Sequence, residues 1–209
     1  MIGLAIHTSS PELGLALTNL QGLERNQVWP LGRDLTTYLH TCLGEFMRPY
    51  AWADLAFLAV AKGPGGFTGT RIGVVVARTL AQQLSIPLFG ISSLAAIAQA
   101  HHQSRPITPN HPPHIAVVLR AQRGELFGAI YQRHPSGLTG ILPEAVHSQA
   151  AWEAHLHSWP TPYSLITAEG GLAASVTGVL TLAKQRWEAG DRPHWQTVLP
   201  FYGQHPVHK

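Results

Sequence analysis

The chain has 209 residues, of which 45% are hydrophobic and 12% are charged, and its formal net charge at pH 7 is +3. This composition is typical of a globular protein with one or two domains and excludes a disordered chain. The lysines and arginines are scattered, which argues against nucleic-acid binding by this chain alone. The single cysteine, Cys42, excludes an intramolecular disulfide and cysteine-based zinc sites. We expect a cytoplasmic protein, because there is no signal-peptide pattern and no apolar run long enough for a membrane span.

The first half of the chain predicts three strands in a meander, followed by alternating helices and strands. The strands of the meander are expected at residues 2–9, 13–19 and 23–29. Asp34 is a favourable N-cap for the helix that follows. The apolar face of this helix carries Leu35, Leu39, Cys42 and Phe46. Beyond it we expect a buried strand over 55–61, a helix over 69–84, a strand over 87–91 and a helix over 92–102 with Ser92 or Ser93 as its cap.

A segment rich in Pro and His separates a second set of elements from the first. Residues 103–114 read as a linker between a lobe at 1–102 and a lobe at 115–209. The expected elements of the second lobe are strands over 115–119, 125–133 and 163–168, helices over 148–157 and 171–190, and a turn over 134–140. Meandering strands that then alternate with helices indicate an α/β protein with mixed sheets.

A glycine-rich loop joins the expected buried strand to the next helix, in the sequence AKGPGGFTGTRIG. Its glycines are Gly63, Gly65, Gly66 and Gly69. Their spacing fits neither the P-loop pattern, which also needs a Lys followed by Ser or Thr, nor the dinucleotide pattern G-x-G-x-x-G. A glycine loop at a helix N-terminus favours an anion, but a tight strand-to-helix turn without a ligand needs glycines as well. The residues alone leave both interpretations open.

The helix after this loop has small residues at every fourth position, namely Gly69, Gly73, Ala77 and Ala81. Glycine inside a helix costs about 1 kcal/mol relative to alanine, so another backbone is expected to lie close to this face. That backbone belongs either to the chain's own sheet or to a second protein. The helix is apolar on nearly all sides, which favours burial on two sides. We therefore expect a partner helix here, next to a neighbouring apolar row of Ile72, Val76 and Leu80.

The segment GPGGFTGTRIG resembles the G-P-G-S-F-T-G-L-R-I-G signature of the TsaB (YeaZ) family. Four weaker matches occur in the family's order: IGLAIHTS near the start, then IPLFGISSLAAIA, RAQRGELFGAIY and VLPFYG. The resemblance implies an ASKHA fold, the two-lobed α/β architecture of actin, sugar kinases and Hsp70. It also implies a non-catalytic scaffold that pairs with TsaD and works with the ATPase TsaE. That complex transfers a threonylcarbamoyl group to the adenosine next to the anticodon of tRNAs that read ANN codons.

The resemblance also implies where the partner binds. The family's first two helices form its dimer, either with TsaD or as a homodimer, and they correspond to residues 34–47 and 69–84. The expected interface residues are therefore Leu35, Leu39, Cys42, Phe46, Gly69, Ile72, Gly73, Val76, Ala77, Leu80 and Ala81. We expect this chain to meet tRNA only as part of the complex, and we expect it not to bind a membrane.

Several positions depart from the family pattern in ways that argue against catalysis. His7 replaces the Asp of the first strand, and imidazole is a poor substitute for the oxygen ligands that Mg²⁺ prefers. Gly66 replaces a Ser of the signature, Arg120 and Gln122 replace the Asp and Arg of D-A-R, and Ala168 replaces a late Gly. We interpret the site as a degenerate phosphate loop made of His7, Thr8, Ser9, Gly63, Gly65, Gly66, Thr68 and Gly69.

Two other functions remain as alternatives. The glycine loop alone would suit an autonomous nucleotide-hydrolysing enzyme of the sugar-kinase class, and weak ATP or ADP binding stays open. A second alternative is a module that binds tRNA directly. No metal cofactor is expected, because H-E-x-x-H is absent and the histidine pairs at 101–102 and 155–157 cannot share a helix face.

Overall fold

The structure, a computed structural model, describes residues 1–22, 24–105, 111–201 and 203. Its first sheet contains β1 (Ile2–His7), β2 (Leu13–Thr18), β3 (Glu24–Trp29), β4 (Leu55–Ala61) and β5 (Leu88–Ile91). The strand order is β3-β2-β1-β4-β5. β1 is antiparallel to β2 and parallel to β4, and β4 is parallel to β5, so the sheet is mixed as expected.

The second sheet repeats this plan with one strand fewer among the described residues. It contains β6 (His114–Arg120), β7 (Glu125–His134), β8 (Gly137–Ser148) and β9 (Tyr163–Ala168), in the order β8-β7-β6-β9. β6 is antiparallel to β7 and parallel to β9, just as β1 is antiparallel to β2 and parallel to β4. The two units are therefore related in topology, although no repeat is visible in the sequence.

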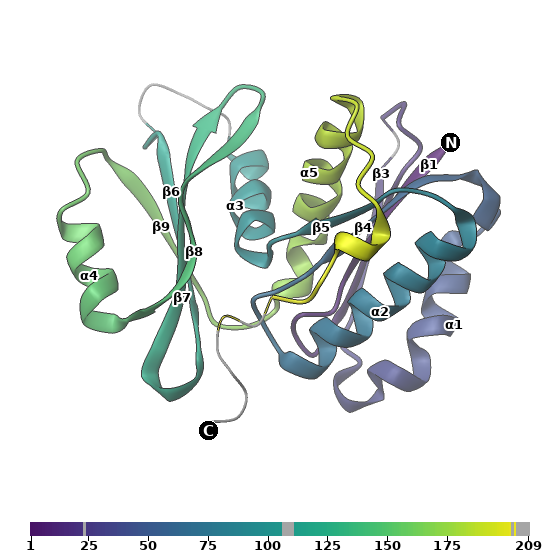
Figure 1. Cartoon of the computed structure of the whole chain (residues 1–209), viewed down its shortest axis with the longest axis horizontal. Coiled ribbons are helices and arrows are strands. Elements are labelled where there is room, and N and C mark those ends of the chain that lie inside the picture. The colour runs from purple at the N-terminus through teal and green to yellow at the C-terminus, as the bar shows by residue number, and fades with distance from the viewer. Residues whose placement is uncertain (23, 106–110, 202, 204–209) are drawn as a thin grey trace.

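The helices form layers outside and between the two sheets (Figure 1). They are α1 (Leu35–Met47), α2 (Phe67–Leu84), α3 (Ser93–Ser104), α4 (Gln149–His157) and α5 (Val176–Glu188). α1 and α2 cover the outer face of the first sheet, and α4 covers the outer face of the second. α5 packs on the inner face of the first sheet, α3 packs on the second sheet, and the two helices pack on each other.

Each interface between layers has its own apolar core. Phe57 and Phe89 are fully buried between the first sheet and α5, with their ring centroids 5.6 Å apart. Trp152 of α4 is buried against the second sheet, together with Ile130. At about 25 cal/mol per Å² of apolar surface, such side chains each contribute roughly 2–3 kcal/mol. The cores hold the two lobes together through α3 and α5.

Two expectations about the second lobe were wrong. The expected turn over 134–140 is much tighter, because β7 runs to His134 and the twelve-residue strand β8 begins at Gly137. The lobe boundary at 115–209 does not follow the packing, because α5 belongs to the core of the first sheet. Part of the expected linker, residues 106–110, lies outside the described residues, as do Leu23 of an expected strand and Tyr202 of VLPFYG.

Candidate functional site

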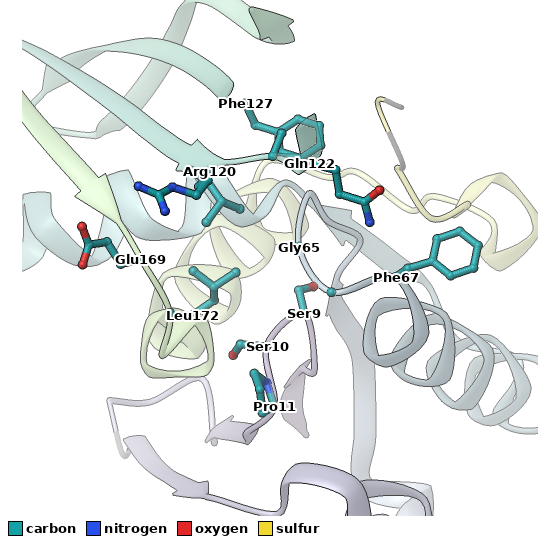
Figure 2. Close-up of a pocket in the computed structure, with 14 residues that line it drawn as sticks. Ser9, Ser10, Pro11, Gly65, Phe67, Arg120, Gln122, Phe127, Glu169 and Leu172 are labelled. Atoms are coloured by element: carbon teal, nitrogen blue, oxygen red, sulfur yellow. The ribbon is translucent and has the colours of Figure 1, made fainter. Parts of the chain in front are cut away.

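A cleft of about 580 Å³ lies between the two lobes, close to the glycine loop (Figure 2). A cavity of this size is typical of small-molecule sites. Its first wall comes from the turn after β1 and the start of α2, with Ser9, Ser10, Pro11, Gly65, Gly66 and Phe67. Its second wall comes from the ends of β6 and β9, and includes Arg120, Gln122, Phe127, Glu169 and Leu172. Sequence reasoning picked out Arg120 and Gln122, but it missed Glu169, although Glu169 directly follows Ala168, the position compared with a late Gly of the family pattern.

The glycine loop is packed against the chain itself. The Gly66 N–H donates a 2.7 Å hydrogen bond to the Ser9 carbonyl. A Cβ on Gly65 would overlap the same carbonyl oxygen, so only glycine permits this approach. Gly63 has a φ of +101°, a left-handed conformation that also favours glycine. The Ser9 backbone thus occupies a donor that a phosphate loop would offer to its ligand.

His7 ends β1 below this loop and is fully buried. Its Nδ1 accepts the Ser9 N–H at 3.3 Å, so the ring proton belongs on Nε2, which has no hydrogen-bond partner among the described residues. Burial lowers the pKa of His7 to about 3, because a charged imidazolium would lose its hydration there. A neutral imidazole therefore stands where the family has a carboxylate. Within the described residues there is also no group of three or more metal-ligating side chains.

The small residues of α2 pack against the chain's own strand end, not against a partner. A Cβ on Gly69 would overlap the Thr8 carbonyl, and a Cβ on Gly73 would overlap Thr8 Oγ1. The Thr8 hydroxyl also donates a 2.7 Å hydrogen bond to the Gly69 carbonyl. Ala77 and Ala81 are fully buried in the first core. The expectation that these four residues form a docking surface was wrong, because α2 needs them to approach β1.

The expected apolar face of α1 is likewise turned inward. Four residues of this face are at most 9% exposed and belong to the core of the first sheet: Leu35, Leu39, Cys42 and Phe46. They are therefore not available to a partner, which corrects the expectation for all four. Three residues of α2 are only partly buried at the edge of the same core: Ile72, Val76 and Leu80. Thr68 is exposed in the first turn of α2.

Sequence reasoning missed the apolar side chains that do face outward on these two helices. Tyr38 of α1 is 51% exposed and Val75 of α2 is 61% exposed. Both helices lie on the outer side of the first sheet (Figure 1). The run Val74-Val75-Val76 was the available signal, because three successive positions on a helix cannot all face one sheet.

A buried polar network joins the start of α3 to the second sheet. Ser92 caps α3, as expected, by accepting the N–H groups of Leu94 and Ala95, and its hydroxyl donates to Glu144 of β8. Burial raises the pKa of Glu144, although the Ser92 hydroxyl and Lys62 partly oppose the shift. Burial and the Glu144 charge also raise the pKa of Tyr131, which shares a hydrogen bond with Ser92. The network therefore fixes α3 to β7 and β8.

We expect Ser92→Ala to lower the free energy of unfolding by about 2 kcal/mol. About 1 kcal/mol comes from the lost helix cap, and about 1 kcal/mol from the hydrogen bond that the buried Glu144 carboxyl group loses. Ser148→Ala is the matched control, because Ser148 caps α4 by accepting the Ala151 N–H, and it should cost about 1 kcal/mol only. Urea unfolding followed by circular dichroism measures both losses, and equal losses would contradict a contribution from Glu144.

Comparison with known proteins identifies the class and then the family. YeaZ from Pseudomonas aeruginosa has the same fold, with a TM-score of 0.76 and 22% identity over 96% of this chain and 99% of that chain. The expected two-lobed α/β fold of the ASKHA class is thereby confirmed. A family model described as "TsaD: tRNA N6-adenosine threonylcarbamoyltransferase" matches residues 41–183.

Two relatives are described as "tRNA threonylcarbamoyladenosine biosynthesis protein TsaB". The protein from Bacillus subtilis is 33% identical over 71% of this chain and 63% of its own length. The protein from Escherichia coli is 30% identical over 70% of this chain and 64% of its own length. The matches thus span less than two thirds of these relatives. The chain belongs to the TsaB (YeaZ) family, within the group that the TsaD model describes. In the described part of the chain, the helices are too short or too polar to cross a membrane.

Proposed function

We propose that this chain is a non-catalytic subunit of a complex that makes threonylcarbamoyladenosine in tRNA. In this proposal it pairs with a catalytic TsaD-type subunit through the outer surface of α1 and α2. TsaE and tRNA join the resulting complex. The observation that carries the proposal is the exposed, charge-poor surface of these two helices, in a chain whose relatives are named for this pathway.

The outer surface of α1 and α2 has the chemistry of a protein interface. α1 contains one Asp, Glu, Lys or Arg residue, Glu45, and α2 contains Arg71 and Arg78. Tyr38 and Val75 are more than half exposed on the same two helices. Interface centres are enriched in aromatic side chains and depleted of charged ones, whereas a helix that faces only water usually carries charges there. This surface therefore supports a partner whose own surface is likewise poor in charge.

The cleft supports a non-catalytic role. A phosphate loop binds through free backbone N–H groups, but here the Gly66 N–H is bonded to Ser9. The neutral His7 offers no oxygen to a magnesium ion. The alternative, an autonomous nucleotide-hydrolysing enzyme, would need other groups to bind the phosphate and the magnesium ion. Calorimetry of the isolated chain with ATP and Mg²⁺ decides between them, since tight binding with turnover would overturn the proposal.

We expect Val75→Asp to weaken pairing with the TsaD-type subunit by at least about thirtyfold. A carboxylate buried in an interface without a partner costs about 2 kcal/mol or more. Because Val75 is 61% exposed in the free chain, the variant should retain its thermal unfolding midpoint within a few degrees. Isothermal titration of the catalytic subunit with each variant measures the effect.

Leu165→Asp is the matched control, because Leu165 is 50% exposed and lies on β9 of the second sheet, not on the sheet that α1 and α2 cover. It should pair as tightly as the unmodified chain. Equal affinities for Val75→Asp and Leu165→Asp would show that the interface lies elsewhere. Reconstitution with TsaD- and TsaE-type proteins on unmodified tRNA, with and without this chain, tests the function itself. Full activity without this chain would overturn it.

A further inference from the structure

A cluster of basic side chains lies where α3 ends beside the end of β7, remote from the cleft. We refer to His101, His102, Arg105 and Arg133 as the α3–β7 basic cluster. The Nε–H of Arg133 donates to His102 Nδ1 at 3.2 Å, and its Nη2 donates to the Arg105 carbonyl at 2.6 Å. Arg133 is only 7% exposed, whereas Arg105 is exposed. The two guanidinium groups thus flank the C-terminal turn of α3.

The positive charge of this cluster is not balanced by an acid. Among the described residues, the ion pairs Lys184–Glu188 and Arg186–Asp191 do not involve the cluster, and neither Arg105 nor Arg133 has a carboxylate partner. The two acceptors of Arg133 are a neutral imidazole nitrogen and a backbone carbonyl. The negative end of the α3 dipole supplies only about half a charge. Buried charges are normally paired, so a counter-anion is missing.

The same cluster contains an imidazole with an unused polar atom. His101 Nε2 is buried and has no hydrogen-bond partner among the described residues. Burial lowers the pKa of His101 first, and Arg105, Arg133, His102 and His111 lower it further by repulsion. Burial and Arg133 likewise lower the pKa of His102. An anion placed here would reverse that repulsion, and a protonated His101 would become a hydrogen-bond donor toward it.

We propose that the α3–β7 basic cluster binds a phosphate group of an RNA backbone. Guanidinium groups pair with phosphate through two parallel N–H donors, and Arg105 presents such a fork at the surface. The source of the phosphate rests on the proposed function, in which the substrate of the complex is a tRNA. Binding takes up a proton on His101, and it is therefore tighter at pH 6 than at pH 8.

The first experiment tests the site in the isolated full-length chain, with inorganic phosphate as the probe. Histidine ring signals are followed by NMR from pH 5 to 8 in phosphate and in sodium chloride of equal ionic strength. The pKa of His101 should rise in phosphate but not in chloride. Arg105→Gln should abolish this difference, and Arg33→Gln, at an exposed arginine beside α1, should preserve it. Identical titrations in the two salts would overturn the site.

The second experiment tests the RNA, using unmodified tRNA and the complex reconstituted with the TsaD-type subunit. Arg105→Gln should weaken tRNA binding roughly tenfold and reduce the slope of log affinity against log salt by about 1. Arg33→Gln should change neither quantity. Equal effects of the two variants, or displacement of the tRNA by a glutamate-rich peptide, would overturn the RNA assignment. If the complex is active without this chain, the proposed function is wrong. The phosphate experiment then still tests whether the α3–β7 basic cluster binds an anion.

Discussion

Gly73→Ala should lower the free energy of unfolding by about 1–3 kcal/mol, although alanine normally stabilises a helix. The added Cβ would overlap Thr8 Oγ1 and lie 3.4 Å from Thr8 Cβ. Thr8 is fully buried and its hydroxyl is bonded to the Gly69 carbonyl, so it cannot turn away without losing that bond. Overpacking costs about 1–3 kcal/mol and the lost hydrogen bond adds about 1 kcal/mol, while the helix propensity of alanine returns about 1 kcal/mol. Urea unfolding of the purified chain measures the change.

Gly44→Ala is the matched control for this prediction. Gly44 is also inside a helix, α1, but it is exposed and a Cβ there would meet nothing within 4 Å. It should therefore gain about 0.5–1 kcal/mol from helix propensity alone. If Gly73→Ala were as stable as Gly44→Ala, the close approach of α2 to Thr8 would be wrong. Gly73→Leu should fail to fold, and for this reason it cannot serve as an interface variant.

Acidification should destabilise the chain through His7 by about 2 kcal/mol between pH 6.5 and pH 5. The pKa of His7 is about 3 in the folded chain, against 6.5 in the unfolded chain. The unfolded chain therefore binds a proton that the folded chain refuses, and each pH unit in this window removes about 1.36 kcal/mol. The stabilisation is complete above pH 6.5 and is lost progressively as the pH falls toward 3. Urea unfolding at a series of pH values measures it.

His7→Asn separates this effect from that of the other ionisable groups. The Asn Oδ1 can accept the Ser9 N–H that His7 Nδ1 accepts at 3.3 Å, but the amide does not titrate. Between pH 6.5 and 5, the variant should take up about one proton fewer on unfolding than the unmodified chain. Glu144, whose pKa burial raises, acts in the opposite direction, because its carboxyl group favours the folded chain at low pH. Identical slopes for the two proteins would contradict the buried, neutral state of His7.

The sequence predicted correctly the elements that carry a clear local signal, either an apolar run typical of a strand buried on both faces or a polar residue that caps a helix. The run LAFLAVA predicted a buried strand over 55–61, and β4 spans Leu55–Ala61. Ser92 or Ser93 was expected to cap α3, and Ser92 does. β8 was missed because it is an edge strand of intermediate and exposed residues that contains Pro143, so neither apolar alternation nor length marked it. Its pairing with β7 depends on contacts that no local pattern contains.

The sequence could not show whether a given face of a helix packs on the chain's own sheet or faces a partner. Periodicity groups Gly69, Gly73, Ala77 and Ala81 on one face of α2, but an apolar face can cover the chain's own sheet or another protein. Only the position of Thr8 at the end of β1 shows that these small residues are needed inside. The surface offered to a partner is then the neighbouring face with Val75. The glycine loop has the same explanation, since Ser9 rather than a ligand lies against it.

The packing of α5 on the first sheet also determines the order in which the chain can fold during its synthesis. The inner face of that sheet, with Phe57 and Phe89, is covered by residues of α5 such as Val179. When β5 has emerged from the ribosome, nearly a hundred residues remain before α5 is complete. At 5–20 residues per second this leaves the apolar face uncovered for roughly 5–20 s. The first lobe is therefore expected to need a chaperone during this interval, and to aggregate if the chain is truncated before α5.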